Sequence, residues 1–584
     1  MKISIANENP GAIVKLDERT REDGIVLLDL NITFPEPTTP KPVALKWKIP
    51  CVDAYSVWNA GGSFSRYLGI NWAKRVCRSR LASGAPFYAL ISFTGENRMT
   101  ITLSDPKTPI EIASGVKEET SEIACEIRFF TEPVGKMTSY TATIRIDTRP
   151  VDYCKALRDA DRFLSDDCGY PSAYIPAPAR APMYSTWYSF HQNIDVDKIV
   201  DQCKLAKQYG MESVIVDDGW QTDDSSRGYA YCGDWEACPQ KVSDMKAFVD
   251  RVHALGMKFI LWFSVPFVGI HSKAYQRFSG MFLDGDKTVS GNDWAILDPR
   301  YPEVRKFLVE TYVNAKKEWG LDGFKLDFID EFRLFKQSKT FDERWDTASL
   351  EDGVEKLLAE VTSALRALDP EILIEFRQSY FGPAIRKYGN MIRVTDCPND
   401  PLVNHVRSTD LRLVSDRTPI HSDMLMWNKI DGVESVAHQL LACLFTVPQI
   451  SVRIDEIPDA HKEALCFWLS YIKENRDLLL DGTFSAKSPE QLYTQLKAEK
   501  DGRIIAVAYA DPLLLLDADC ELRSLDFINA TGGKTLVIKT KKPLGTKAYR
   551  ILDCTGKEIS SGTLNFTQGT HAFDIPRGGM LRVL

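Results

Sequence analysis

The sequence predicts an α/β protein: a (β/α)8 TIM barrel, preceded by an N-terminal antiparallel β-sandwich and followed by a small C-terminal β domain. Two observations predict the barrel. Eight candidate strands alternate with helical stretches, and together they cover about 300 residues, the usual scale of this fold. A third observation predicts the boundary before the barrel: the proline-rich segment 170–182 cannot continue a helix or a central strand. We expect domains at residues 1–175, 180–480 and 485–584.

The first domain is expected to be a sandwich because its β-patterned segments are short and are separated by clusters of Gly, Asn, Asp and Pro. These segments are 24–33, 87–93, 99–104, 123–130 and 140–147. One short helix is expected near residues 151–164.

The barrel strands are expected at 184–189, 213–216, 258–263, 323–328, 372–376, 391–395, 419–422 and 449–452. Helices are expected at 195–209, 245–255, 303–319, 354–368 and 435–445, and a longer one at 459–480 closes the region. A doubly wound open sheet is the competing architecture, but no glycine-rich phosphate turn follows the first strand. Alternating β patterns return at 501–510, 534–539, 548–553 and 580–584.

Composition argues against several classes of function. The formal charge of −8 is small for 584 residues, and no basic run suggests a nucleic acid as partner. The sequence shows neither a long apolar span nor the pattern of a secretion signal, so we expect a cytoplasmic protein without a membrane partner. Thirteen scattered cysteines suit a reducing compartment, and eight histidines without HxxxH or HxH pairs give a metal site weak support. We expect no cofactor and no metal, and we leave open a homo-oligomer.

Charged residues interrupt the fourth barrel strand at Lys325 and Asp327. Successive strand side chains alternate between faces, so these two share one face of the strand. Such charges are costly in a core, but the C-terminal end of a barrel strand is where catalytic groups are found. We interpret Asp327 as a nucleophile and Lys325 as the neighbour whose charge holds it ionised. A buried Lys–Asp pair that serves packing or register is the alternative.

Polar or aromatic residues end seven consecutive strands, which packing alone does not explain. In chain order they are Trp187 and His191, then Asp217, Asp218 and Trp220, then Trp262 and Ser264, then Lys325 and Asp327, then Glu375 and Arg377, then Arg393 and Asp396, then His421 and Asp423.

This combination of residues is typical of sugar recognition. Charged groups hydrogen-bond hydroxyls in pairs, and aromatic faces stack on a pyranose. Glycoside hydrolysis needs two carboxyls that flank one bond, and Asp327 and Asp396 on strands four and six can face each other across the barrel mouth. A retaining mechanism requires the two carboxyls at roughly 5–7 Å, whereas a much wider gap favours inversion.

Three segments resemble the signature segments of the melibiase-type α-galactosidases, glycoside hydrolase family 36 in the clan it shares with family 27. They are Asp217-Asp-Gly-Trp220, Lys325-Leu-Asp-Phe328 and Arg393-Val-Thr-Asp396. The resemblance implies that Asp327 is the nucleophile and Asp396 the acid/base. It also implies that Asp217 and Asp218 bind the 4- and 6-hydroxyls of the sugar. Lys325 and Arg393 would lie near the reacting ring.

The sequence departs from the family pattern at three strand ends. Trp262-Phe-Ser-Val-Pro266 stands where the family has an acidic segment, and Phe376-Arg-Gln-Ser-Tyr-Phe-Gly382 stands where it has a cysteine- and glycine-rich turn near the 2-hydroxyl. After strand six, Thr395-Asp-Cys-Pro-Asn-Asp400 offers Asp400 as a second candidate for the acid/base, and we favour Asp396.

Each candidate also has a structural alternative. Asp217 and Asp218 can cap the next helix. Trp187, Trp220 and Trp262 can pack in the core. Arg377 can bridge to Glu375 instead of contacting a sugar hydroxyl, and His421 with Asp423 is more often a hydrogen-bonded pair than a catalytic dyad.

We therefore predict a retaining α-galactosidase that hydrolyses terminal α-linked galactose from oligosaccharides through a covalent glycosyl-enzyme intermediate. The predicted substrate-binding residues are Asp217, Asp218, Trp220, Lys325, Arg393, Trp187, Trp262, Arg377 and Asp400. The alternatives are the same mechanism on an α-glucoside or α-N-acetylgalactosaminide, and a catalytically silent sugar-binding protein.

Overall fold

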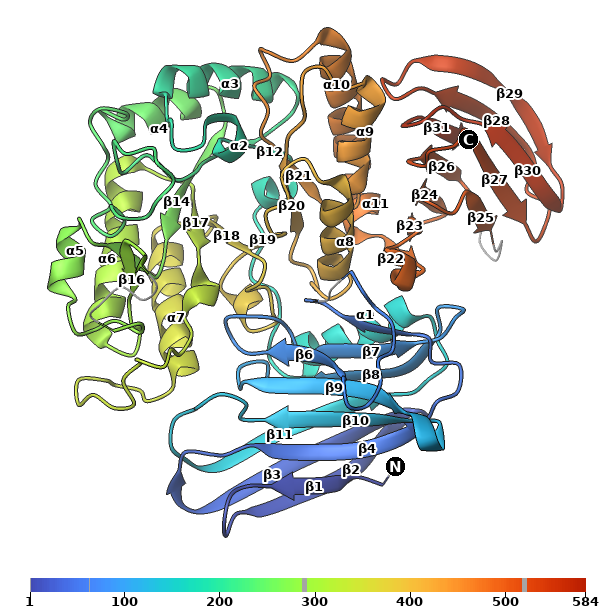
Figure 1. Ribbon diagram of the computed structural model, residues 1–584. Helices are drawn as coiled ribbons and strands as arrows, with labels where there is room; N and C mark the ends of the chain where they lie inside the picture. The colour runs from blue at the N-terminus through green and yellow to red at the C-terminus, as the bar shows by residue number, and fades with distance from the viewer. Residues whose placement is uncertain (1, 62–63, 286–290, 517–521) are drawn as a thin grey trace.

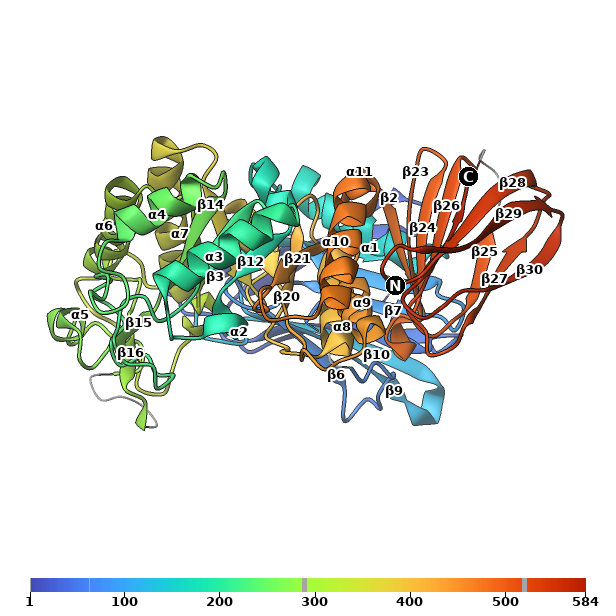
Figure 2. The same ribbon diagram turned by 90° about the horizontal axis from the view of Figure 1, so that it is seen from above.

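The computed structural model describes residues 2–61, 64–285, 291–516 and 522–584. It contains a closed parallel barrel with β-sheets before and after it in the chain (Figure 1). The N-terminal sheets lie against one side of the barrel region and the C-terminal sheet against another, as the view from above also shows (Figure 2). The predicted fold class is confirmed.

The N-terminal region consists of two antiparallel sheets. Strand pairs such as Ile144 with Leu28 fix the register of the second sheet, and the apolar faces of the two sheets share one buried core. The first sheet has the order β1 (Ser4–Asn7), β4 (Val43–Pro50), β10 (Glu122–Phe129), β9 (Ile110–Lys117) and β6 (Arg75–Ser79). The second has the order β2 (Ile13–Glu22), β3 (Ile25–Thr38), β11 (Met137–Asp147), β8 (Asn97–Leu103), β7 (Phe87–Ile91) and β5 (Ser56–Asn59).

The barrel closes because its first strand pairs in parallel with its last, Met183 opposite Gln449. In order around the barrel the strands are β12 (Met183–Ser185), β13 (Ser213–Val216), β14 (Lys258–Ser264), β17 (Gly323–Asp327), β18 (Leu373–Arg377), β19 (Met391–Arg393), β20 (Ile420–Leu425) and β21 (Val447–Ile450). Small and aliphatic side chains fill one end of the barrel interior: Met183, Ile215, Ile260, Leu373 and Met391. The charged side chains lie nearer the other end.

Helices surround the barrel, and the predicted ones are present with small shifts at their ends. They are α1 (Tyr153–Arg162), which leads from the sandwich, α3 (Val196–Gln208), α4 (Met245–His253), α6 (Pro302–Trp319), α7 (Leu350–Leu368) and α9 (Val433–Ala442). The expected helix 459–480 is divided at Asn475 into α10 (Asp459–Glu474) and α11 (Arg476–Asp481). A short hairpin of β15 (Phe267–Gly269) and β16 (Trp294–Ile296), with α5 (Lys273–Arg277), follows β14.

Two predictions about the barrel are wrong in detail. The first strand ends at Ser185, and residues 187–190 form the short helix α2 (Trp187–Phe190), because the hydroxyl of Ser451 accepts hydrogen bonds from the amides of Tyr188 and Ser189. A helix absent from the predicted set, α8 (Pro401–Arg412), lies between β19 and β20.

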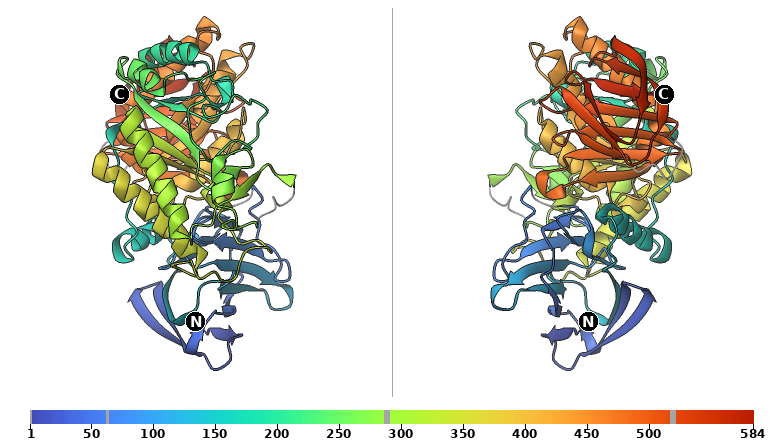
Figure 3. Two further views of the ribbon diagram at one scale, coloured as in Figure 1. Left: turned by 90° about the vertical axis from the view of Figure 1, so that its left-hand side faces the viewer. Right: turned by 90° about the vertical axis from the view of Figure 1, so that its right-hand side faces the viewer.

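The C-terminal region is a larger sheet faced by a smaller one, with its own apolar core (Figure 3). The larger sheet has the order β22 (Thr483–Lys487), β23 (Gln495–Lys500), β24 (Arg503–Ala508), β26 (Ser524–Asn529), β31 (Met580–Val583), β28 (Gly545–Leu552) and β29 (Glu558–Phe566). The smaller one contains β25 (Leu513–Leu516), β27 (Thr535–Thr540) and β30 (Gly569–Asp574). Among the described residues, no helix is long and apolar enough to cross a membrane.

Candidate active site

Asp327 is the last residue of β17, and hydrogen-bond donors hold both of its carboxylate oxygens. Oδ1 accepts from Arg377 Nε at 2.5 Å and from the Phe328 amide at 2.7 Å, and Oδ2 accepts from Trp262 Nε1 at 2.9 Å. The Tyr380 hydroxyl lies 3.3 Å from Oδ1. This network fixes the carboxylate at the C-terminal end of the strand, where barrel enzymes place catalytic groups.

The electrostatic surroundings keep Asp327 ionised. Burial by itself would raise the pKa of this carboxyl, but the positive charges of Arg377, Lys325 and Arg393 outweigh burial and hold the pKa well below its usual range. A permanently ionised carboxylate suits a nucleophile and does not suit a proton donor.

The backbone after Asp327 turns sharply. Phe328 has φ 67°, a left-handed conformation that is uncommon for a bulky residue, and its amide points back to Asp327 Oδ1. Local strain of this kind gathers at functional sites.

Arg377 forms an ion pair with Asp327 and, among the described residues, none with Glu375, so the predicted structural bridge is absent and the contact with a sugar hydroxyl stays a prediction. Its guanidinium also lies 3.7 Å from Asp330 and 4.9 Å from the ring centroid of Phe328. A cation in direct contact with the nucleophile candidate therefore occupies the position where the sequence departs from the melibiase pattern.

Lys325 forms its ion pair with Asp217, at 2.6 Å between Nζ and Oδ2, and both side chains are buried. The pair joins β17 to the end of β13 across the barrel interior. Lys325 still contributes to the low pKa of Asp327 through its charge. A buried Lys–Asp pair, the structural alternative for Lys325 and Asp327, is therefore present, but Lys325 forms it with Asp217 and not with Asp327.

Asp218 is a buried carboxyl with two amide donors. Gln221 Nε2 donates to Oδ1 at 2.7 Å and Gln192 Nε2 donates to Oδ2 at 2.6 Å. Burial raises the pKa of Asp218 to about 6 despite these hydrogen bonds. Neither Asp217 nor Asp218 caps the next helix, because the N-cap of α4 is Asp244, which accepts from the Ala247 amide.

Asp396 lies just beyond β19, and its side chain is 57% exposed. Arg393 Nη1 donates to Asp396 Oδ1 at 2.7 Å and to Asp423 Oδ1 at the same distance. Partial burial raises the pKa of Asp396, Arg393 and Lys325 lower it more strongly, and the charge of Asp327 opposes them. Asp327 and Asp396 thus share the field of Arg393 and Lys325 and influence each other.

Asp400 has a structural task. Its side chain caps α8 by accepting the Val403 amide at 3.0 Å. The structure thus gives Asp400 a role as a helix cap, and the substrate contact predicted for it stays a prediction.

His421 and Asp423 are separate groups. His421 Nε2 lies 2.8 Å from the carbonyl of Ala179, and burial lowers the pKa of His421 to about 4. Asp423 accepts from the Tyr188 hydroxyl at 2.8 Å and from the Cys397 amide at 2.6 Å. They form neither a catalytic dyad nor the hydrogen-bonded pair that the sequence favoured.

The three tryptophans differ in their surroundings. Trp220 is fully buried, donates to the Trp262 carbonyl and packs against Trp235, Phe263 and Trp319, so its substrate contact stays a prediction. Trp262 is also buried but contacts Asp327 directly. Trp187 is half-buried on α2 and packs against His191 with the two rings tilted and their centroids 3.8 Å apart.

The sequence interpretation missed several site residues. Tyr380, Gln192 and Gln221 hold the carboxylates, and Thr186 accepts the amide of Asp217 at 2.9 Å. Of these residues, Gln221 could have been suspected from the sequence, because it directly follows the Asp217-Asp-Gly-Trp220 segment. Single amides and hydroxyls in loops carry no spacing pattern that would have indicated the rest. Within the part of the chain that the structure describes, no group of three or more metal-ligating side chains is present.

Comparison with known proteins agrees with this geometry. Residues 177–380, which contain β12 to β18 and the residues around Asp217 and Asp327, match the family model described as Melibiase. This part of the chain is therefore similar to the melibiase family. Asp396 and Arg393 lie outside the matched residues.

Several curated proteins match this chain over short segments. α-Galactosidase Mel36A of Lactobacillus acidophilus is 29% identical over 156 residues, 26% of this chain and 20% of the relative. The A type blood α-D-galactosamine galactosaminidase of Flavonifractor plautii is 27% identical over 227 residues, 35% of this chain and 20% of the relative. The matched part of the chain thus spans about a fifth of these relatives' own length.

Solved structures show that the fold extends beyond the melibiase domain. The family 36 α-galactosidase AgaA of Geobacillus stearothermophilus, solved with raffinose, has a TM-score of 0.68 at 14% identity, covering 98% of this chain and 82% of that one. The α-galactosidase of Lactobacillus brevis has a TM-score of 0.67 at 16% identity, covering 100% and 81%. The whole three-part architecture is therefore that of family 36 structures.

Proposed function

We propose that the chain is a retaining α-galactosidase that releases terminal α-linked galactose from oligosaccharides. The observation that carries the proposal is Asp327, a buried and ionised carboxylate held at a strand end by Arg377 and Trp262. The melibiase match of the segment around it supports the same activity.

The proposed first step is attack by Asp327 Oδ on the anomeric carbon. A covalent bond forms between them, the glycosidic bond breaks, and Asp396 gives its proton to the leaving oxygen. In the second step Asp396 takes a proton from water, the water oxygen attacks the same carbon, and Asp327 leaves as a carboxylate. Two inversions give net retention of the anomeric configuration.

The coupling between the two carboxyls supports this exchange of roles. The pKa of Asp396 lies below its usual value because Arg393 and Lys325 lower it, and the negative charge of Asp327 opposes them while Asp327 is free. When Asp327 becomes an ester this contribution disappears. Arg393 and Lys325 then act on Asp396 without opposition and favour its carboxylate, which is the form needed to activate water.

Sugar binding is proposed for the groups around these two carboxyls. Asp218 and Asp217 are buried acceptors at the end of β13, Lys325 contacts Asp217, and Arg393 contacts Asp396. Trp187, half-buried on α2, is proposed to contact the substrate through its ring. That the family 36 enzyme AgaA was solved with raffinose supports an oligosaccharide as substrate.

A second candidate keeps the mechanism and changes the sugar. It is favoured by Arg377, whose guanidinium stands beside the nucleophile where the family pattern has a cysteine- and glycine-rich turn. The galactosamine-specific name of the Flavonifractor plautii relative supports a test of amino sugars.

A panel of p-nitrophenyl α-glycosides tests the proposal and separates the candidates. The account expects the α-galactoside to have the highest kcat/KM, and Asp327→Ala to lose at least about a thousandfold, equivalent to about 4 kcal/mol of transition-state stabilisation. Preference for the α-glucoside or an amino sugar would favour the second candidate. Sugar binding without turnover of any glycoside would favour the silent sugar-binding protein.

We also propose a cytoplasmic location. The twelve described cysteines are all free, although most of them are buried in the interior. Free thiols in this number suit a reducing compartment.

A further inference from the structure

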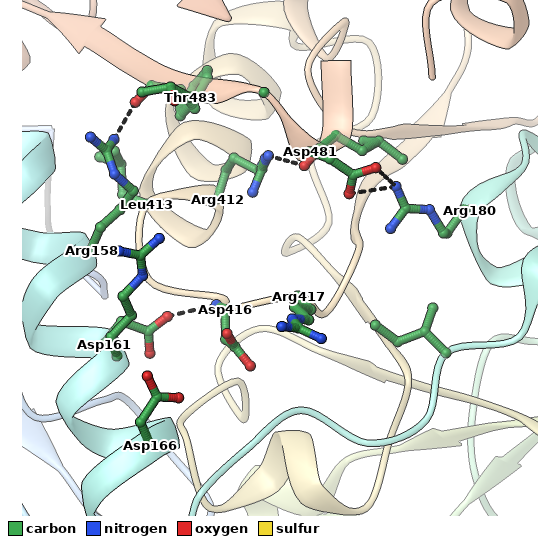
Figure 4. Close-up of a pocket in the computed structure, with 15 residues that line it drawn as sticks. Arg158, Asp161, Asp166, Arg180, Arg412, Leu413, Asp416, Arg417, Asp481 and Thr483 are labelled. Carbon is green, nitrogen blue, oxygen red and sulfur yellow. Dashed lines mark hydrogen bonds and ion pairs between the residues drawn. The ribbon is translucent and has the colours of Figure 1, made fainter. Parts of the chain in front are cut away.

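A polar cavity of about 570 Å³ lies on the opposite face of the barrel from the candidate active site. Its lining comes from α1, from the segment before β12, from the turn between α8 and β20, and from the start of β22. The segments adjoining β12 and β20 meet at the N-terminal ends of those strands, whereas Asp327 and Asp396 follow C-terminal ends. Figure 4 shows side chains from all these parts of the chain around the same space.

Arginines dominate the lining of this cavity, and most of them have no carboxylate partner. Arg180 forms a bidentate pair with Asp481, both contacts at 2.7 Å. Within the described residues, none of the other four arginines is within ion-pair distance of a carboxylate: Arg158, Arg162, Arg412 and Arg417. The cavity therefore contains four guanidinium groups whose charge no carboxylate of the described residues pairs.

The acidic residues of the lining offset only part of this charge. Asp161 is already paired with the buried Arg386 at 2.5 Å. Asp416 accepts from the Ser172 hydroxyl at 2.8 Å, and Asp166 accepts from the Ser165 hydroxyl at 2.9 Å. Two aspartates without a cation thus face four arginines without an anion, which leaves two positive charges in excess.

Arg412 shows the consequence most clearly. It donates through Nη2 to the carbonyl of Leu480, but its Nε is buried and has no hydrogen-bond partner among the described residues. Burial, together with the charges of Arg180 and Arg158, lowers the pKa of Arg412 to about 10, although Asp481 opposes this shift. A buried donor without an acceptor costs free energy, which a bound anion would recover.

The Arg158 guanidinium, by contrast, is held in place by a hydrogen bond that does not neutralise its charge. Its Nη1 donates to the carbonyl of Phe484 at 2.5 Å, so the guanidinium is oriented while its charge stays unpaired. Arg162 and Arg417 are exposed at the edge of the cavity. Oriented inner arginines with exposed outer ones are arranged as in sites that enclose an anion from several sides.

We propose that this cavity binds a phosphate group, either as free phosphate or as the phosphomonoester of a small molecule. A phosphate dianion matches the excess of two positive charges, and its tetrahedral oxygens accept from several planar guanidinium forks at once. The cavity volume leaves room for a hexose-sized group attached to the phosphate.

Isothermal titration of the full chain with inorganic phosphate, with galactose 6-phosphate and with galactose tests the proposal. We expect binding of inorganic phosphate and of galactose 6-phosphate that substitutions in this cavity weaken, whereas galactose should bind at the candidate active site and be unaffected by them. Arg162→Gln and Arg417→Gln remove exposed side chains for which the described part of the chain provides no ion-pair partner, so both variants should fold. Each should weaken phosphate binding about tenfold or more, the effect of losing one charge-assisted hydrogen bond.

Arg251→Gln is the matched control, because Arg251 is an exposed arginine on α4 that lies outside the cavity and forms an ion pair with Asp197. It should leave phosphate binding unchanged. Tighter binding of galactose 6-phosphate than of phosphate would identify a phosphomonoester as the occupant, and equal binding would identify the free anion. Absence of binding at about 10 mM phosphate, or equal binding by wild type and both cavity variants, would overturn the proposal.

Discussion

At the scale of single residues, Arg377 has the most direct control over the proposed nucleophile. Its Nε donates to the same oxygen of Asp327 that the Phe328 amide holds, and its charge is the largest influence opposing burial in the pKa of that carboxyl. Reactivity and protonation of Asp327 should therefore depend on this one guanidinium.

Arg377→Gln removes the charge and should raise the pKa of Asp327. Because the pKa lies well below its usual range in the native protein, kcat of the wild type should persist to low pH, and the acid limb of kcat in the variant should move up by at least about one pH unit. The measurement is kcat against pH with a saturating aryl α-galactoside. An unmoved acid limb would show that Arg377 does not set the charge of the nucleophile.

Asp218 should produce a different pH effect, on substrate binding. Burial raises its pKa to about 6, so it is ionised and accepts sugar hydroxyls above that pH but becomes protonated below it. KM should therefore rise as pH falls through about 6. Asp218→Asn, in which Asp217 is unchanged, should have a high KM at every pH and show no rise in KM near pH 6. A KM independent of pH in the wild type would argue against this role of Asp218.

At the scale of elements, α8 separates the two candidates for the acid/base. Asp400 caps this helix, whereas Asp396 lies beyond β19, outside the helix, and accepts a hydrogen bond from Arg393. Asn caps a helix about as well as Asp. Asp400→Asn should thus leave the free energy of unfolding unchanged and change kcat by no more than about twofold. Asp396→Asn should lower kcat about a hundredfold or more on glycosides with poor leaving groups.

The comparison of these two variants uses an unactivated substrate such as raffinose beside an aryl glycoside. Loss of proton donation should be smaller for the aryl glycoside, whose leaving group needs less protonation. The opposite ranking, an inactive Asp400→Asn and an active Asp396→Asn, would transfer the acid/base role to Asp400.

Most strands of the barrel could be predicted because their apolar segments are local in the sequence. Helix α8 was missed although Asp400 followed by Pro401 is a standard N-cap and first-turn pair, since the preceding Cys397 to Asn399 has the composition of a loop. The end of β12 could not be predicted, because it depends on the hydroxyl of Ser451, which lies 262 residues from Ser189 in the sequence.

The site shows the same limit. The types of residue at the strand ends indicated the chemistry, but their pairings depend on which strands lie side by side and on rotamers. Lys325 pairs with Asp217, 108 residues away, and Arg377 pairs with Asp327, 50 residues away. Trp220 follows the two site aspartates in the sequence, yet its side chain turns into the core.

At the scale of the whole molecule, one buried network joins the three parts of the chain. Arg66 and Trp58 come from the N-terminal region, Asp410 from α8 of the barrel, and Tyr493 from the C-terminal region. Arg66 Nη2 contacts both oxygens of Asp410 at 2.9 and 2.8 Å, and Trp58 Nε1 donates to the Tyr493 hydroxyl at 2.7 Å. The network should make the three parts unfold together.

Asp410→Asn breaks the ion pair and leaves Arg66 buried without an anion. Such a loss typically costs about 3–5 kcal/mol, so the free energy of unfolding should fall by that amount. Urea unfolding followed by tryptophan fluorescence checks this, and separate transitions should appear in the variant. Asp250→Asn breaks the exposed pair with Lys246 and should cost at most about 0.5 kcal/mol. Equal effects of the two variants would show that the network does not join the parts.

The central claim is that Asp327 attacks the anomeric carbon and that the configuration is retained. Proton NMR during the first minutes of hydrolysis of p-nitrophenyl α-galactoside observes this directly, because the two anomers of released galactose have separate signals and interconvert more slowly than an efficient enzyme forms them. The account predicts α-galactose as the first product, followed by slow appearance of the β anomer. β-Galactose as the first product would contradict double displacement through Asp327.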